Sequence, residues 1–175
     1  MYSRSRTKNI VIAGLLLAIG VIVPSIFHST ALPGQILLPM HIPVLLGGFL
    51  LPPSLAILLG MLTPLANNLV TGMPLLFPSM VIMIFELGVY GLIASLFYRR
   101  LNWNIIISLI LAMLMGRVAA GLVVFVLAQF FNIGLDPIIY VKGAIEIGLP
   151  GMVIQIILIP TLMYAINRYT TINLD

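Results

Sequence analysis

The chain has 175 residues, of which 62% are hydrophobic and only 7% carry a formal charge. Soluble domains contain about 25% charged residues, so this composition excludes a water-soluble globular protein and indicates a polytopic membrane protein. The net charge of +4 comes from basic residues at the ends of apolar stretches, which indicates membrane topology and argues against a nucleic-acid partner.

Apolar stretches separated by charged residues, proline and glycine predict six helices, packed as one membrane domain over residues 1–175. A helix needs about 20 apolar residues to cross the hydrocarbon core of a bilayer. The first apolar stretch follows Arg4, Arg6 and Lys8 and is longer than the core of a signal peptide, so we expect an uncleaved helix. The six expected helices cover residues 9–27, 41–51, 54–70, 77–98, 104–131 and 138–167.

The second and third helices are short because Pro52 and Pro53 interrupt the apolar stretch that contains them. One kinked span would place Arg99 and Arg100 opposite the N-terminal basic cluster. Two short spans would place them, and Arg168, on the same side as that cluster. Since cytoplasmic loops collect Lys and Arg, we favour two spans. The predicted fold is therefore an all-α, six-helix membrane bundle with both termini in the cytoplasm.

Glu86 and Arg117 lie inside apolar helices, where a charged side chain costs roughly 2.5–3.5 kcal/mol on insertion scales. Counted from Tyr98 and Asn104 at about 1.5 Å per residue, both lie roughly 18–20 Å from the inner surface. We therefore expect the two side chains to meet across the fourth and fifth helices. Two interpretations stay open: a structural salt bridge between helices, or the wall of an outward-facing ligand pocket.

Further polar residues are expected on the outer side of this pair. Tyr90 shares a helix face with Glu86, and Glu146 with Lys142, because the members of each pair are four residues apart. Structural roles are available to several of these residues, since asparagine often caps a helix and lysine can extend its amine to the membrane surface. The candidate substrate-binding residues are Glu86, Tyr90, Arg117, Lys142, Glu146, Asn67 and His41.

Small residues recur at four-residue spacing on two helices, a pattern that lets helix backbones approach closely in lipid. The fifth helix carries Ala112, Gly116 and Ala120 beside the buried arginine, and there we expect internal packing. The first helix carries Gly14 and Ala18. For that helix, internal packing and contact with a partner protein both stay open.

Catalytic chemistry finds no support in the sequence. It contains no HExxH metal motif, no GxSxG nucleophile elbow, no glycine-rich phosphate loop and no cysteine. Nothing supplies a full set of metal ligands or a nucleophile with its base. We therefore expect neither enzyme activity nor a cofactor nor a bound metal, and any ATP hydrolysis would belong to partner subunits.

Three segments resemble the substrate-binding S components of energy-coupling factor (ECF) vitamin transporters. They are Leu38-Pro39-Met40-His41-Ile42-Pro43, Thr71-Gly72-Met73-Pro74 and Phe85-Glu86-Leu87-Gly88-Val89-Tyr90-Gly91. The resemblance implies capture of a vitamin or vitamin precursor from outside a bacterial plasma membrane, by the last three helices and the loop after the first. It also implies docking of the first helix onto a transmembrane T component driven by two ATPase subunits. Gly14 and Ala18 would make this contact, with Gly14 in place of the first alanine of the family's AxxxA motif.

The substrate stays open because the candidate site carries both signs of charge. A carboxylate-bearing vitamin such as pantothenate suits Arg117 and Lys142 and is our first expectation. Neutral or weakly basic pyridoxine, hydroxymethylpyrimidine or α-ribazole would instead use Glu86 and Glu146. A self-sufficient channel or secondary transporter is the alternative function, although it needs a polar path through the inner half, where polar side chains are scarce. A scaffold protein with a purely structural polar cluster is a third interpretation.

Overall fold

The computed structural model describes residues 2–29 and 34–169, which form helices and connecting turns without any strand in these two ranges. This confirms the predicted all-α class. In chain order the elements are α1 (Tyr2–Ser29), α2 (Gly34–Leu37), α3 (His41–Leu50), α4 (Pro53–Thr71), the π-helical turn η1 (Leu76–Met80), α5 (Val81–Ser95), the π-helical turn η2 (Leu96–Arg100), α6 (Ile105–Phe131) and α7 (Pro137–Tyr169).

Five helices in the described ranges are long and apolar enough to cross a membrane, namely α1, α4, α5 with its flanking turns, α6 and α7. Helix α3 has 10 residues and is therefore about 15 Å long, half the thickness of a typical hydrocarbon core. Six spans were predicted, the second and third of them short; the structure has five membrane-capable helices, and the short α3 stands where the second span was predicted. The four-residue helix α2 was not predicted and lies in the segment expected to be the loop after the first helix.

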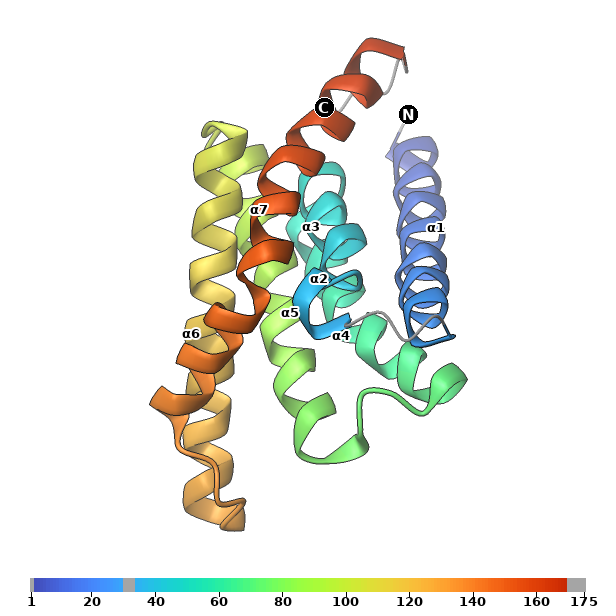
Figure 1. Cartoon of the computed structure of the whole chain (residues 1–175). Coiled ribbons are helices and arrows are strands. Elements are labelled where there is room, and N and C mark those ends of the chain that lie inside the picture. The colour runs from blue at the N-terminus through green and yellow to red at the C-terminus, as the bar shows by residue number, and fades with distance from the viewer. Residues whose placement is uncertain (1, 30–33, 170–175) are drawn as a thin grey trace.

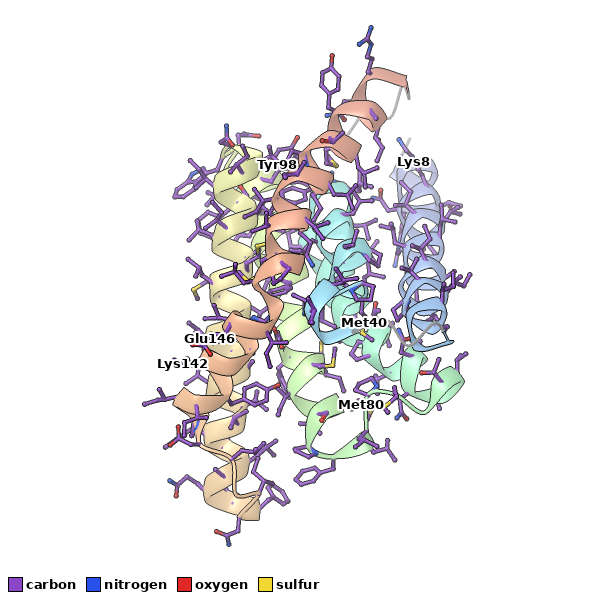
Figure 2. All side chains as sticks on the ribbon, viewed as in Figure 1. Lys8, Met40, Met80, Tyr98, Lys142 and Glu146 are labelled. Carbon is purple, nitrogen blue, oxygen red and sulfur yellow. The ribbon has the colours of Figure 1, made fainter. Side chains whose placement is uncertain are left out.

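Helix α5 occupies the centre of the bundle and packs against α3, α4 and α6. Helix α1 lies along one side, against α3 and α4, while α7 packs against α6, α2 and α3 on the other side (Figure 1). The described ends of α1 and α7 lie at the same end of the molecule (Figure 1), where Lys8 and Tyr98 also lie (Figure 2). We call this the basic end, because Arg6, Lys8, Arg99 and Arg100 belong to the segments that meet there.

Two buried apolar clusters hold the helices together. The larger one joins α1, α3, α4, α5, α6 and α7 and includes Phe49, Leu87 and Ile159. The smaller one joins α5 to the second half of α6 through Ile82 and Val124. On α5, Glu86 lies between residues of the two clusters, and on α6 Arg117 does so as well. The apolar packing on either side therefore fixes where the two charged side chains can stand.

Helices α4 and α5 approach each other through glycine. A Cβ at Gly60 would collide with the backbone carbonyl of Leu87, and one at Gly91 would collide with that of Ala56. On α6 the small-residue stripe is buried, and Gly116 lies directly against the ring of Tyr90. This confirms the internal packing that was expected for α6.

The end of α3 is satisfied by side chains from α5 and η2. A short helix leaves its last carbonyl groups without helical partners, and inside a membrane these need another donor. The Ser95 hydroxyl donates to the carbonyl of Leu51 at 2.7 Å, and Arg99 donates to that of Leu50. The chain can therefore turn at Pro52 and Pro53 without exposing unpaired backbone groups to lipid.

Candidate substrate-binding site

Glu86 on α5 and Arg117 on α6 form a buried ion pair. The Nη1 atom of Arg117 lies 2.5 Å from Oε1 of Glu86, and the two residues are only 5% and 2% exposed. The contact confirms the predicted meeting of these residues across the two helices. It is possible because Gly116, the neighbour of Arg117, lets α6 approach the Tyr90 ring.

Two further residues approach the same carboxylate oxygen. The Tyr90 hydroxyl donates to Oε1 of Glu86 at 3.3 Å, one helical turn along α5. The Nε2 atom of His41, at the start of α3, lies 3.8 Å from this oxygen, and its ring centroid lies 5.3 Å from that of Tyr90. We call these four residues, His41, Glu86, Tyr90 and Arg117, the polar cluster. All four were predicted as site residues, and the structure brings them together.

The polar cluster retains unused hydrogen-bonding groups. Among the described residues, Nε and Nη2 of Arg117 and both ring nitrogens of His41 have no hydrogen-bond partner. Leaving such groups unpaired in a buried site costs about 1–3 kcal/mol each, more when the group is charged. The Nε and Nη2 hydrogens of an arginine point in the same direction and form a fork that matches the two oxygens of a carboxylate. The free edge of Arg117 is therefore shaped for an anionic group.

Helix α7 and the segment around α2 cover this free edge. A Cβ at Gly148 would lie 3.1 Å from Nη2 of Arg117 and 3.0 Å from Cδ1 of Leu38. Gln155 donates from Nε2 to the carbonyl of Leu38 at 3.3 Å, and Gly151 allows the carbonyl of Ile36 to approach the helix closely. The sequence interpretation missed the two glycines, although their three-residue spacing on one helix face is a packing pattern.

Lys142 and Glu146 lie outside the polar cluster. Their side chains approach each other at 3.8 Å and are 74% and 64% exposed. They line a groove of about 670 Å³ between α6 and α7, together with apolar residues such as Val118 and Phe125. Figure 2 places both on the half of α7 away from the basic end. The structure therefore separates them from the charged pair that was predicted to share their site.

Asn67 connects α4 to α1. Its Nδ2 atom donates to the carbonyl of Gly20 at 2.6 Å. That carbonyl has no helical partner four residues on, because Pro24 lacks an N–H group. This bond gives Asn67 a role in helix packing, and the side-chain hydrogen bonds of Asn67 to described residues do not involve the polar cluster.

Gly14 and Ala18 lie on the exposed face of α1. A Cβ added at Gly14 would meet no atom of the described residues within 4 Å. Helix α1 as a whole is the least buried of the membrane-capable helices described. This face therefore makes no packing contact at Gly14 with the described remainder of the molecule.

The described residues contain no group of three His, Asp or Glu side chains that could hold a metal ion. The unpaired atoms of the polar cluster are nitrogens of Arg117 and His41. Buried ionisable residues in membrane helices mark a candidate site for a ligand or ion.

The chain belongs to the family described as "ECF transporter, substrate-specific component", which it matches over residues 8–166. This match confirms the resemblance seen in the sequence and extends from α1 to the last part of α7. Searches of curated proteins and of solved structures give no significant match. Family membership makes the protein the substrate-binding subunit of an ECF transporter, which is a transport protein and not an enzyme.

Proposed function

We propose that this protein captures a small carboxylate-bearing vitamin, with pantothenate as the first candidate, by binding the carboxylate to Arg117. The observation that carries the proposal is that the guanidinium of Arg117 is hydrogen-bonded on one side only. Its Nη1 atom is held by Glu86, while Nε and Nη2 have no partner among the described residues. The pair with Glu86 orients the guanidinium, and the free edge can then donate two parallel hydrogen bonds to the ligand carboxylate.

A neutral or weakly basic vitamin fits this cluster less well. Pyridoxine, hydroxymethylpyrimidine or α-ribazole would require an acceptor such as Glu86. Its Oε1 atom already accepts hydrogen bonds from Arg117 and Tyr90. The unused groups of the cluster are mainly donors, so an anion gains more from binding there.

The direction of capture follows from the distribution of charge. Cytoplasmic segments of membrane proteins are rich in Lys and Arg, so the basic end should face the cytoplasm. Both termini would then be cytoplasmic, and the vitamin would enter from the opposite side of a bacterial plasma membrane. The T component and two ATPase subunits of the importer would receive the loaded protein. We assign the contact with the T component to Gly14 and Ala18, because this face of α1 is exposed.

Calorimetric titration of pantothenate into the purified protein in nanodiscs tests the site. We expect Arg117→Ala to abolish binding and Arg117→Lys to weaken it at least tenfold, because lysine keeps the charge beside Glu86 but lacks the guanidinium fork. Arg100→Ala is the matched control, since Arg100 is exposed at the basic end. A folded Arg117→Lys variant with wild-type affinity would contradict the assignment of Arg117 as the ligand contact.

A self-sufficient channel or secondary transporter would behave differently. It would move its substrate across liposomes that contain only this chain, without ATP or partner subunits. Such transport would overturn the proposed role as a capture subunit. Pantothenate binding without transport in the same liposomes would support that role.

A further inference from the structure

The electric charge of the polar cluster is balanced before any anion binds. We propose that His41 takes up one proton from solution when a carboxylate ligand binds to Arg117, so that the protein binds the anion and the proton together. This inference rests on the proposed function, because it requires an anionic ligand at the free edge of Arg117. The inference concerns His41 and a bound proton, whereas the proposed function concerns Arg117 and the bound vitamin.

The charges around His41 can be counted directly. Glu86 and Arg117 cancel at 2.5 Å, and His41 is 3% exposed. A charged imidazole in the empty cluster would add a third, uncompensated charge to a buried site, which is strongly unfavourable. The empty site is therefore balanced with a neutral His41.

Among the side chains that the structure describes, the elements packed around α3 supply no other buried charge near His41. Helix α5 contributes Glu86 and Tyr90, and α6 contributes Arg117. The described residues of α2 and α4 include no ionisable side chain. The charged residues of α7, Lys142, Glu146 and Arg168, are exposed, and its Tyr140, which interacts with Glu86 and Arg117, is a phenol that is uncharged near neutral pH. Arg99 of η2 donates to the carbonyl of Leu50 at the far end of α3, and the described basic residues of α1 lie near its first turns at the basic end.

A bound carboxylate changes this balance by one negative charge. Arg117 cannot neutralise both Glu86 and the ligand, so the cluster would be left with a net charge of −1 in a medium of low dielectric constant. His41 can supply the missing positive charge. Its two ring nitrogens have no hydrogen-bond partner in the described part of the chain, and Nε2 is 3.8 Å from Oε1 of Glu86.

Protonation gives each nitrogen of His41 a defined role. A neutral imidazole has one donor and one acceptor, whereas an imidazolium has two donors. One N–H can donate toward Glu86 and the other toward the ligand. The proton comes from the buffer, and no bond in the ligand or the protein is broken. Tyr90 already donates its hydroxyl hydrogen to Glu86, so it cannot replace His41 in this role.

Calorimetry at pH 7.5 in phosphate and in Tris measures the proton directly, because the two buffers release protons with very different enthalpies. For pantothenate we expect uptake of about one proton per ligand, and affinity that falls by up to about tenfold per pH unit as the pH rises. Pantothenol, which has an alcohol in place of the carboxylate, provides the neutral comparison. Any binding of pantothenol should proceed without proton uptake.

The His41→Gln variant identifies the group that is protonated. Glutamine keeps a donor and an acceptor but does not titrate, so this variant should bind pantothenate more weakly and without proton uptake. The Arg100→Ala control should keep the uptake. Proton uptake that persists in His41→Gln, or pantothenate binding to the wild type without uptake, would overturn the inference and leave the proposed function intact. Failure of the wild type to bind pantothenate would overturn both.

Discussion

Arg117 has five N–H donors, and within the described structure only Nη1 is engaged in a hydrogen bond, with Glu86. The salt bridge and the ligand pocket, which the sequence left as two interpretations, are therefore compatible at this residue. The ion pair prevents rotation of the guanidinium, and a rigid guanidinium loses less entropy when it binds a carboxylate. The cost of burying Arg117 is offset in part by Glu86, and the remaining donors are left for recognition.

Gly148 lies against those donors, and we expect its lack of a side chain to leave room for the ligand there. A methyl group at this position would lie 3.1 Å from Nη2 of Arg117, on the free edge of the guanidinium. We expect Gly148→Ala to weaken pantothenate binding by about tenfold or more, which corresponds to at least ~1.4 kcal/mol. Calorimetric titration of the purified variant measures this loss.

Gly143→Ala is the matched control on the same helix. A Cβ at Gly143 meets no described atom within 4 Å, so the substitution changes only the helix propensity, by about 1 kcal/mol in favour of alanine. This control should bind pantothenate as tightly as the wild type. Equal affinities of the Gly148→Ala variant and the control would show that the ligand does not approach Arg117 from the side of α7.

At the scale of helices, α4 and α5 are held at a separation that only glycine permits. The atom that a Cβ at Gly60 would strike belongs to the backbone of Leu87, and a backbone atom cannot rotate away. This close approach supports α5 from the side opposite the polar cluster. It therefore contributes to the position of Glu86 without touching it.

We expect Gly60→Ala to destabilise the protein by about 1–3 kcal/mol, because the two helices must separate to accept the methyl group. Thermal unfolding of the detergent-solubilised protein measures the effect, and Gly143→Ala again controls for helix propensity. The midpoint should fall for Gly60→Ala and stay the same or rise for the control. An unchanged midpoint for Gly60→Ala would mean that the two helices can separate at little cost.

Some of these contacts between helices could be predicted from the sequence, and others could not. Depth along a helix follows from residue count, so the meeting of Glu86 and Arg117 could be predicted. The direction that a side chain faces could not be predicted for α7, whose exposed positions are largely apolar and give little contrast between its faces. Lys142, predicted to face the site, instead lies exposed beside Glu146. The bond from Asn67 to α1 depends on a carbonyl that Pro24 leaves without a helical partner. The residue pattern of one helix does not show which side chain of another helix will donate to such a carbonyl.

For the molecule as a whole, the positions of the basic residues and of the chain ends predict how the protein is oriented in the membrane. The described ends of α1 and α7 lie together at the basic end (Figure 1). The segment 132–136 lies at the opposite end of α6, a helix of 27 residues and therefore about 40 Å long. The connections at the two ends of α6 should thus lie on opposite sides of the bilayer.

The complete absence of cysteine makes this orientation directly measurable, because a single introduced thiol is the only site of labelling. Leu101 and Leu135 are exposed residues in the connections before and after α6. We expect a membrane-impermeant maleimide to label Leu135→Cys in intact cells and to label Leu101→Cys only after the membrane is opened, because the basic end should face the cytoplasm. The reverse pattern would place the basic end outside and contradict capture from the extracellular side. Labelling of both variants in intact cells would contradict a bilayer-spanning α6.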